Sequence, residues 1–337
     1  MGFEFEKKVG LEAVTKAAKV CARMSGKPEF REALYKTDGS PVTLADFFVQ
    51  ALINEKLTAA FPETPIVAEE TSFCLEGSCG EKLRKNLEKL LPGKSPDEIF
   101  RAINRGNYGG GNHGRFWTLD PIDGTRGFLA KRQYAIALAL IEAGEVVLGI
   151  LGCPELGPDA RNGTGREKGF VFFAEKGQGS YQAALSNGLQ TRISVSGIAR
   201  TSEAVMCESV EAPDSSYEFS GKISRFLDIS AGPVRMDSQC KYAILARGDT
   251  SIYLRPPPRK DYKENIWDHA AGYIIVKEAG GTVTDSSGKP LDFSVGKKLL
   301  ENKGVLATNG AIHEAVLQAV KKTVSERNKL TDQVSRE

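Results

Sequence analysis

Histidine and closely paired cysteines are scarce in this sequence, which limits how the protein could bind a metal ion. Only three histidines (His113, His269 and His313) occur among 337 residues, and none of the six cysteines belongs to a C-x-x-C pair. A zinc ribbon or a disulfide framework is therefore not indicated. Cys74 and Cys79 lie five residues apart and could pair if oxidised, but we expect reduced thiols in a reducing compartment. Any bound metal must be held mainly by oxygen atoms.

An excess of charge of either sign is also missing, as is a long apolar run. The sequence has 45 Lys and Arg against 43 Asp and Glu and no long basic block, so we expect no nucleic-acid polymer as a partner. The longest apolar run near a strand, from Tyr134 to Ile141, is about half of what a membrane-spanning helix needs, so we expect no membrane. The opening MGFEFEKK has acids where a secretory leader has bases. We expect a soluble, cytoplasmic protein, and an organellar location after removal of a presequence stays open.

The hydrophobic pattern divides the chain into two halves. Apolar residues at helical spacing predict helices over about 4–24 and 44–60, and strand-like runs dominate up to about residue 185. Beyond that point predicted strands and helices alternate, and they include a long helix over 265–279. We therefore predict an α+β protein, with an antiparallel-sheet domain over residues 1–185 and an α/β domain over 186–337.

Two segments stand apart from this pattern. Residues 71–114 contain a capping box at Ser95 that predicts a helix through Asn104, followed by GNYGGGNHG with five glycines in nine residues. We expect an insertion or lid with a flexible hinge, and a plain surface loop is the alternative. The polar tail after Lys321 is expected to fray.

The stretch WTLDPIDGT contains a pair of acids in an unusual setting. An apolar strand is predicted to end in Asp120, Pro121 to turn the chain, and Asp123 to return three residues later, just before Gly124. Two carboxylates held together repel each other and need a cation or a proton between them. With no thiol or imidazole nearby, such oxygen ligands indicate Mg²⁺, with Mn²⁺ as a substitute. A D-x-x-D turn at the surface is the alternative.

Three further acids stand at the ends of predicted elements. Glu69 follows a short apolar strand over 66–68, and Asp268 lies near the start of a predicted helix, where it could be only a helix cap. Asp46 lies in the first turn of another predicted helix, where the helix dipole favours an acid without any further function. The sequence alone leaves open whether these segments meet in space.

Taken together, the motifs resemble those of a known family. DPIDGT, WDHAAG and the strand-terminal VAEE are similar to motifs of the lithium-sensitive, metal-dependent phosphatases related to inositol monophosphatase and fructose-1,6-bisphosphatase. KTDGSPVTLAD, GRFWTLDPIDGTRGFL, DSQCKY, IYLR and IWDHAAG more closely resemble the 3′(2′),5′-bisphosphate nucleotidases of the yeast and plant type. The resemblance runs from the first helix to about Asn309 and implies a layered αβαβα sandwich.

The resemblance also implies a role for each matching residue. Asp46 and Thr125 would activate the attacking water, and Gly124 and Thr125 would offer backbone amides to the phosphate. Two or three Mg²⁺ ions would be held by the main-chain carbonyl of Ile122 and by four carboxylates, those of Glu69, Asp120, Asp123 and Asp268. The nucleotide would be contacted by Ser238, Lys241, Arg255 and Asp268. Of these, Lys241 and Arg255 suit a 5′-phosphate, although Lys241 could instead be a solvated basic residue. Li⁺ and Na⁺ would inhibit by displacing one Mg²⁺.

The implied activity is the hydrolysis of the 3′-phosphate of adenosine 3′,5′-bisphosphate to AMP, and of the sulfated precursor of that nucleotide. This reaction clears a by-product of sulfate activation, and we expect a monomer that binds a small-molecule nucleotide. No Ser or Cys nucleophile has a convincing signature, and D-x-x-D-G-T differs by one residue from the D-x-D-G-T of haloacid-dehalogenase-type phosphatases, so direct attack by water is expected. An inositol polyphosphate 1-phosphatase and a catalytically weak nucleotide-binding sensor are the alternatives.

The sequence departs from the nucleotidase pattern where the base would bind. Relatives have a histidine that contacts adenine, whereas this sequence has Asp214, and an acid cannot stack as imidazole does. Tyr217 is our candidate to compensate for that histidine. Arg126 replaces the usual lysine after the GT pair and keeps its charge.

Overall fold

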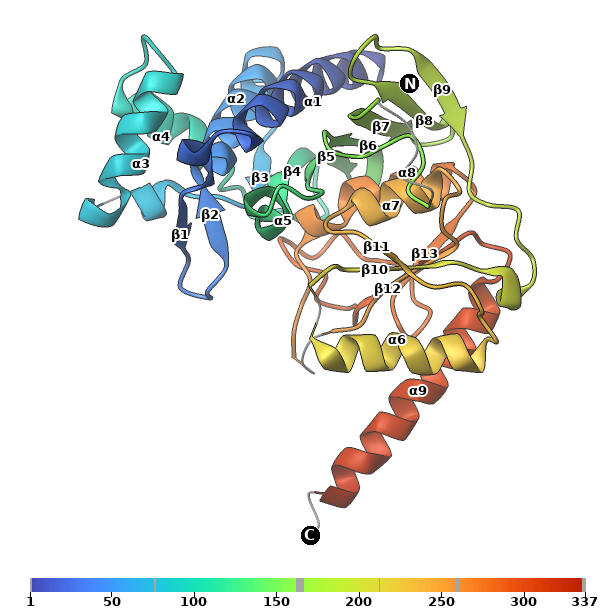
Figure 1. Ribbon diagram of the computed structural model, residues 1–337. Helices are drawn as coiled ribbons and strands as arrows, with labels where there is room; N and C mark the ends of the chain where they lie inside the picture. The colour runs from blue at the N-terminus through green and yellow to red at the C-terminus, as the bar shows by residue number, and fades with distance from the viewer. Residues whose placement is uncertain (1, 76, 162–166, 212, 258–260, 335–337) are drawn as a thin grey trace.

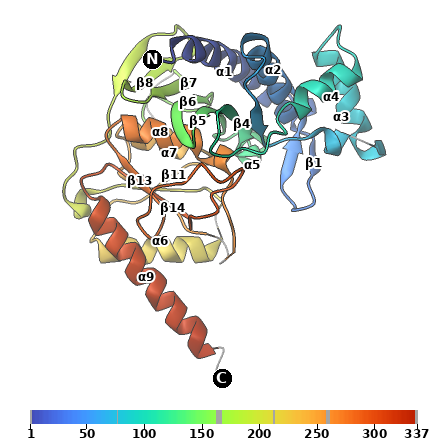
Figure 2. The same ribbon diagram turned by 180° about the vertical axis from the view of Figure 1, so that it is seen from behind.

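Alternating layers of helix and sheet make up the fold of the computed structural model, shown in Figure 1. The structure describes residues 2–75, 77–161, 167–211, 213–257 and 261–334. From top to bottom in Figure 1 lie two helices, a large sheet, a second pair of helices, a small sheet and two last helices, and Figure 2 shows the same order from behind. Within the described ranges, no helix has the length and hydropathy of a membrane span.

The large sheet has seven strands in the described part of the chain, in the order β3-β4-β5-β6-β7-β8-β9. β3 pairs in parallel with β4, and every later pair is antiparallel. Its strands are β3 (Ile66–Ala68), β4 (Arg115–Asp123), β5 (Ala135–Glu142), β6 (Glu145–Cys153), β7 (Phe170–Glu175), β8 (Gly179–Ala184) and β9 (Gln190–Ile193). Because β9 follows residue 185, the large sheet extends past the expected domain boundary, and the division of the chain into domains stays a prediction.

The small sheet is mixed and has the strand order β11-β10-β12-β14-β13. β10 pairs in parallel with β11 and β12, whereas β14 pairs antiparallel with β12 and β13. A separate antiparallel hairpin of β1 and β2 precedes the second helix. These strands are β1 (Ala33–Tyr35), β2 (Pro41–Thr43), β10 (Met206–Glu208), β11 (Val234–Arg235), β12 (Ile252–Arg255), β13 (Thr282–Thr284) and β14 (Val305–Thr308).

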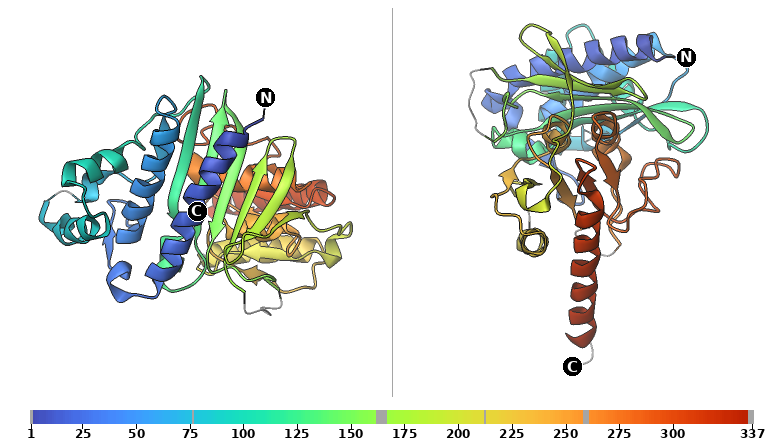
Figure 3. Two further views of the ribbon diagram at one scale, coloured as in Figure 1. Left: turned by 90° about the horizontal axis from the view of Figure 1, so that it is seen from above. Right: turned by 90° about the vertical axis from the view of Figure 1, so that its right-hand side faces the viewer.

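The helices cover the outer faces of both sheets and fill the space between them. Figure 3 shows α1 and α2 across one face of the large sheet, and α7 and α8 lie against its other face, with α8 packed on β6 and β7. α6 and α9 pack together on the far side of the small sheet. The helices are α1 (Glu4–Ser25), α2 (Leu44–Ala60), α3 (Gly77–Leu90), α4 (Pro96–Asn104), α5 (Thr125–Leu129), α6 (Asp214–Phe226), α7 (Cys240–Ala246), α8 (Ala270–Glu278) and α9 (His313–Val334), with short 3-10 turns η1 (Pro28–Arg31), η2 (Ser72–Leu75), η3 (Thr201–Glu203) and η4 (Ile266–Asp268). This order confirms the predicted αβαβα sandwich.

Close packing of the middle layer depends on a glycine in β6. A Cβ on Gly149 would lie 2.7 Å from the carbonyl oxygen of Ala271 in α8. Protein interiors are packed too densely to absorb such a contact, so a larger residue would push α8 away from the large sheet. The glycine therefore fixes the distance between the large sheet and α8, which directly follows Asp268 and His269 in the chain.

The prediction that β4 ends at Asp120 was wrong. The strand continues through Pro121 and ends at Asp123. Its pairing with β5 shifts register between Asp120 and Asp123, so Pro121, which has no N–H to donate, interrupts no regular ladder bond.

Two helix predictions also differ from the structure. The helix expected over 265–279 is broken, because turn η4 ends at Asp268 and His269 has a φ of −136° before α8 begins. At the other end of the chain, the backbone of α9 stays helical to Val334 instead of fraying after Lys321.

Within the segment over 71–114, α3 and α4 lie beside α2, at the left edge of Figure 1. The side-chain amides of Asn54 and Gln50 in α2 donate hydrogen bonds to the carbonyl oxygens of Ala102 (2.9 Å) and Ile103 (3.0 Å) in α4. These bonds are buried and tie α4 to α2. A lid role for this segment stays a prediction.

Candidate active site

Two adjacent strands bring the first acids to one edge of the large sheet. Because β3 and β4 are parallel, with Ala68 opposite Leu119, Glu69 and Asp120 leave the two strands side by side. The backbone N–H of Glu69 donates to the Leu119 carbonyl oxygen (3.2 Å). Asp120 is buried, and Asp123 at the end of β4 is partly buried. Three of the acids singled out in the sequence therefore lie close together.

The carboxylate of Asp120 lies among other acids, and one of its oxygens is left unsatisfied in the described part of the structure. Among the described residues, Asp120 Oδ1 is buried and has no hydrogen-bond partner. Burial, followed by the charges of Glu69, Asp123 and Asp268, raises the pKa of Asp120. Burial also raises the pKa of Asp123 to about 6, against the opposing charges of two basic side chains. An unpaired buried carboxylate among other acids suits a divalent cation with oxygen ligands, so the residues present fit a metal centre.

Asp46 reaches the same site from the start of α2. The backbone N–H and the hydroxyl of Thr43 donate to Asp46 Oδ2 (2.8 and 2.6 Å). The Thr125 hydroxyl lies 3.4 Å from Asp46 Oδ1 and 3.2 Å from the Ile122 carbonyl oxygen. Burial raises the pKa of Asp46 to about 7, against the hydrogen bonds from Thr43. A carboxyl group with a pKa near neutrality beside a threonine hydroxyl can accept a proton from water.

The turn between β4 and α5 requires a glycine. Gly124 has a φ of +87°, and a Cβ there would lie 2.9 Å from the Cβ of Ser238. Gly124 is the N-cap of the short helix α5, which begins at Thr125. This close approach brings Ser238 next to the acids at the end of β4.

Gln239 connects three segments of the site. Its backbone N–H donates to Asp123 Oδ2. Its side-chain amide donates to the Trp267 carbonyl oxygen (2.8 Å) and accepts from the Gly272 N–H (3.1 Å). The residue is buried, so these bonds hold the end of β4, the start of α7 and the η4–α8 segment in fixed positions. Gln239 was missed in the sequence analysis, although it lies inside the quoted DSQCKY motif.

Asp268 lies beside Arg255 of β12. The Arg255 Nη2 atom is 3.2 Å from Asp268 Oδ2 and 2.9 Å from Glu264 Oε2. Burial raises the pKa of Asp268 to about 7, against the charge of Arg255. The carboxylates of Glu264 and Asp268 and the imidazole of His269 lie within 4.8 Å of one another, as metal ligands do. Arg255 already pairs with both of these acids, so we do not assign the three residues to a separate metal centre.

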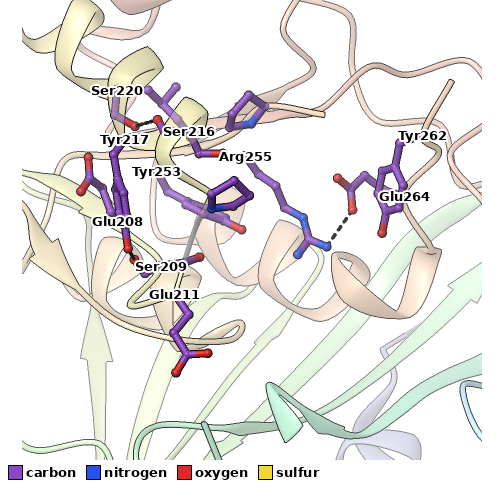
Figure 4. A pocket seen from close by; sticks show the side chains of 13 residues that line it. Glu208, Ser209, Glu211, Ser216, Tyr217, Ser220, Tyr253, Arg255, Tyr262 and Glu264 are labelled. Carbon is purple, nitrogen blue, oxygen red and sulfur yellow. Dashed lines mark hydrogen bonds and ion pairs between the residues drawn. The ribbon is translucent and has the colours of Figure 1, made fainter. Parts of the chain in front are cut away.

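A pocket lies around Arg255 and is lined mainly by the β10–α6 segment and by β12, as Figure 4 shows. In that view Tyr217 and Glu208 stand on one side of Arg255, and Tyr262 and Glu264 stand on the other. The Arg255 side chain is 33% exposed, so part of the guanidinium can meet a ligand. The pocket thus places a cationic group next to the cluster of acids, with Arg255 Nη2 3.2 Å from Asp268 Oδ2.

Lys241 stands in the wall behind this pocket. Its side chain is buried, and its Nζ donates to the Ser209 hydroxyl (3.1 Å) and to the Met236 carbonyl oxygen (3.2 Å). Burial lowers its pKa. A solvated basic residue, the alternative for this position, does not agree with that burial.

Tyr217, the residue expected to compensate for the missing histidine, also lines the pocket. Its hydroxyl donates to the Val210 carbonyl oxygen (2.6 Å), and the Arg235 guanidinium lies 4.8 Å from the centre of its ring. The ring is therefore held in place from two sides. Three other side chains named in the sequence analysis lie outside the described part of the structure, those of Asp214, Cys74 and Cys79.

Lys36 is a further residue that the sequence analysis did not assign to the site. Its Nζ lies 2.7 Å from Glu69 Oε1 and 2.6 Å from Glu70 Oε1. Glu70 is buried, so Lys36 neutralises an acid that water cannot reach. Lys36 opens the KTDGSPVTLAD motif, but no local signal shows that its side chain crosses to the end of β3.

Comparison with known proteins shows which family shares this sequence and fold. The model of the inositol monophosphatase family matches residues 6–325. A 3′(2′),5′-bisphosphate nucleotidase of Schizosaccharomyces pombe is 42% identical, over 95% of this chain and 96% of that protein. Proteins of the same name from Oryza sativa and Dictyostelium discoideum are also 42% identical, each over 94% of this chain. Among solved structures, an IMPase of Thermotoga maritima has a TM-score of 0.62 at 26% identity, with 96% of this chain and 98% of that one covered.

These matches extend over nearly the whole chain and include every segment that meets at the acidic site. The chain belongs to the inositol monophosphatase family and is a phosphatase of that metal-dependent family.

Proposed function

We propose that this phosphatase hydrolyses the 3′-phosphate of adenosine 3′,5′-bisphosphate to give AMP and inorganic phosphate, with Mg²⁺ as its cofactor. The relatives named 3′(2′),5′-bisphosphate nucleotidase support this substrate. The observation that carries the proposal is the pairing of two adjacent sites of opposite charge, a cluster of acids and a pocket that is lined by Arg255 and has Lys241 buried behind its wall. A molecule with two phosphates can satisfy both at once, one through bound cations and one through basic side chains.

The acids and one carbonyl would hold the metal ions. When bound, Mg²⁺ would offset the negative charge of the phosphate and activate the attacking water, and Mn²⁺ would substitute for it. Li⁺ and Na⁺ would compete for one of the ion positions and inhibit. The proposed ligands are Glu69, Asp120, Ile122 through its carbonyl oxygen, Asp123 and Asp268.

The residues beside these ligands would move the proton and bind the phosphate. The Thr125 hydroxyl, within 3.4 Å of Asp46 Oδ1, would orient the water, and Asp46 would accept its proton. The backbone amides of Gly124 and Thr125 would bind the phosphate that is removed. Thr125 cannot be the base itself, because a hydroxyl group does not deprotonate water at neutral pH.

The pocket would bind the rest of the nucleotide. Lys241 and Arg255 would contact the 5′-phosphate, with Ser238 between them and the reacting group, and Tyr217 would contact the base. The sulfated precursor carries a phosphate at the same position, so we include its conversion to adenosine 5′-phosphosulfate. The role of the enzyme would then be to clear the by-product of sulfate activation.

Phosphate release from adenosine 3′,5′-bisphosphate tests the proposal. We expect release with Mg²⁺, none after chelation, and a large loss in Asp123→Asn, measured with the protein folded as judged by circular dichroism. Turnover would also exclude a catalytically weak sensor. A wild-type protein that releases no phosphate with Mg²⁺ would contradict the proposal.

A further inference from the structure

Glu264 is a buried acid in the pocket wall, and the proposed mechanism gives it no task. Its side chain is 3% exposed, and its Oε2 atom lies 2.9 Å from Arg255 Nη2 and 3.2 Å from His269 Nε2. The other ring nitrogen of His269 lies 2.8 Å from the Tyr242 hydroxyl. His269 and Tyr242 are fully buried, so this series of contacts runs from the protein interior to Arg255, its partly exposed member.

Arg255 has two carboxylate partners, and the balance between them decides where its guanidinium points. The same Nη2 atom that pairs with Glu264 at 2.9 Å lies 3.2 Å from Asp268. Without Glu264, Arg255 would keep only Asp268 as a carboxylate partner, so the orientation of its guanidinium would be less firmly fixed. Guanidinium groups form directional hydrogen bonds in a fixed plane, so a small rotation removes their remaining N–H groups from a phosphate.

An acid in the wall of a phosphate-binding pocket would otherwise repel the ligand. In Figure 4 the Glu264 carboxylate lies beside Arg255, and the ion pair joins it to the guanidinium. Its charge is thus neutralised within the wall, and what remains for a ligand is the outer part of the guanidinium.

We infer that Glu264 is a positioning residue, which presents Arg255 to the phosphate at the 5′ position of the nucleotide. His269, which is itself bonded to Tyr242, holds the Glu264 carboxylate from behind. The inference rests on the proposed function, and it names the contact by which the site would prefer a nucleoside bisphosphate to a nucleoside 3′-monophosphate.

Two substrates that differ only in the 5′-phosphate test this role. In Glu264→Gln we expect the KM for adenosine 3′,5′-bisphosphate to rise roughly tenfold or more, the size that follows from weakening a charge-assisted hydrogen bond, with little change in kcat. The KM for adenosine 3′-monophosphate should stay at the wild-type value. Glu264→Asp, which keeps the charge but shortens the side chain, should give an intermediate KM for the bisphosphate and covers the case in which Glu264→Gln fails to fold.

Glu175→Gln is the matched control, because Glu175 is also buried (4% exposed) and also pairs with a basic side chain. Glu175 lies in β7 of the large sheet, and its partner is Lys7 of α1, at 2.8 Å. It should leave both KM values unchanged. Calorimetric titration gives a second measurement, in which Glu264→Gln should weaken binding of AMP but not of adenosine.

Each remaining outcome contradicts either the positioning role of Glu264 or the proposed function. If Glu264→Gln and Glu264→Asp lose activity on both nucleotides equally, or leave the KM for the bisphosphate unchanged, Glu264 has only a structural role. If the wild-type protein hydrolyses neither nucleotide, the proposed function itself is wrong, and this inference is wrong with it.

Discussion

Asp46 is both part of a helix cap and the proposed proton acceptor. It completes the capping box of α2 through Thr43, yet its other oxygen faces the Thr125 hydroxyl. The capping role therefore leaves one oxygen of the same carboxylate available for the proposed role, and whether Asp46 acts as more than a cap stays a prediction.

Removing this carboxylate should reduce the rate of hydrolysis and leave substrate binding nearly intact. We expect Asp46→Asn to lower kcat by about 10²–10⁴, the usual contribution of a positioned base. Asp38→Asn is the control, since Asp38 is an exposed acid nearby that accepts hydrogen bonds only from Ser40 among the described residues. A kcat for Asp46→Asn equal to that of the control would contradict the assignment.

A comparison of Gly124 with Gly39 distinguishes the effect of backbone strain from the effect of close packing. Both have positive φ, +87° and +80°, but a Cβ on Gly39 would meet nothing within 4 Å, whereas one on Gly124 would press on Ser238. Gly39→Ala should lower the free energy of unfolding by about 1–2 kcal/mol and retain activity. Gly124→Ala should cost at least as much and abolish phosphate release. Urea denaturation and activity measured on both variants provide the test, and equal activity would show that the approach to Ser238 is unimportant.

At the scale of whole elements, α2 illustrates what local sequence signals can predict. The expected helix over 44–60 agrees with α2, because Thr43 provides the N-cap and Pro62 prevents continuation. The break at His269 has no such signal, since the run through α8 lacks a proline and stays apolar. Bonds to other segments fix that break, among them the one between His269 Nδ1 and the Tyr242 hydroxyl of α7 (2.8 Å).

The candidate site shows the same division between local and long-range causes. The residue types and spacing of Asp120, Asp123 and Asp268 could be predicted from sequence motifs. That they converge depends on the parallel pairing of β3 with β4 and on the bonds of Gln239, and neither follows from a local pattern.

The capping boxes of α2 and α4 provide a matched pair of elements. Thr43→Val and Ser95→Ala each remove a cap hydroxyl, and each should lower the free energy of unfolding by about 1 kcal/mol. Only Thr43→Val should also lower kcat, because Thr43 donates to Asp46 (2.6 Å). Steady-state kinetics on both variants tests this, and an equal kcat for the two would show that the start of α2 is not coupled to catalysis.

For the whole molecule, the crowded acids couple stability to pH and to metal. Burial raises the pKa of Asp46 and Asp268 to about 7 and that of Asp123 to about 6, so the folded protein binds protons more tightly than the unfolded chain. The free energy of unfolding should then fall as the pH rises from about 4, where unfolded carboxyls ionise, to about 7, and stay level above that. Against its burial, Arg255 and His269 together lower the pKa of Glu264 to about 2, so Glu264 acts in the opposite direction only below pH 4 or so.

We therefore predict that the Tm of the metal-free protein falls between pH 5 and pH 7.5. Mg²⁺ binds the ionised carboxylates of the folded state, so it should raise the Tm more at pH 7.5 than at pH 5. Thermal melts with Mg²⁺ and with chelator measure both effects. Asp123→Asn should reduce them, and a Tm that is insensitive to both pH and Mg²⁺ would contradict the presence of a metal centre among these acids.

The most direct measurement compares kcat/KM for adenosine 3′,5′-bisphosphate and inositol 1,4-bisphosphate, with the same enzyme and Mg²⁺. Each substrate carries two phosphates, so either could reach both the acidic site and Arg255, but only the nucleotide has a base that can contact Tyr217 in the pocket. We predict a preference for the nucleotide of about tenfold or more, since contact between a base and an aromatic side chain contributes about 1–3 kcal/mol. Equal values, or a preference for the inositol phosphate, would contradict the proposed substrate.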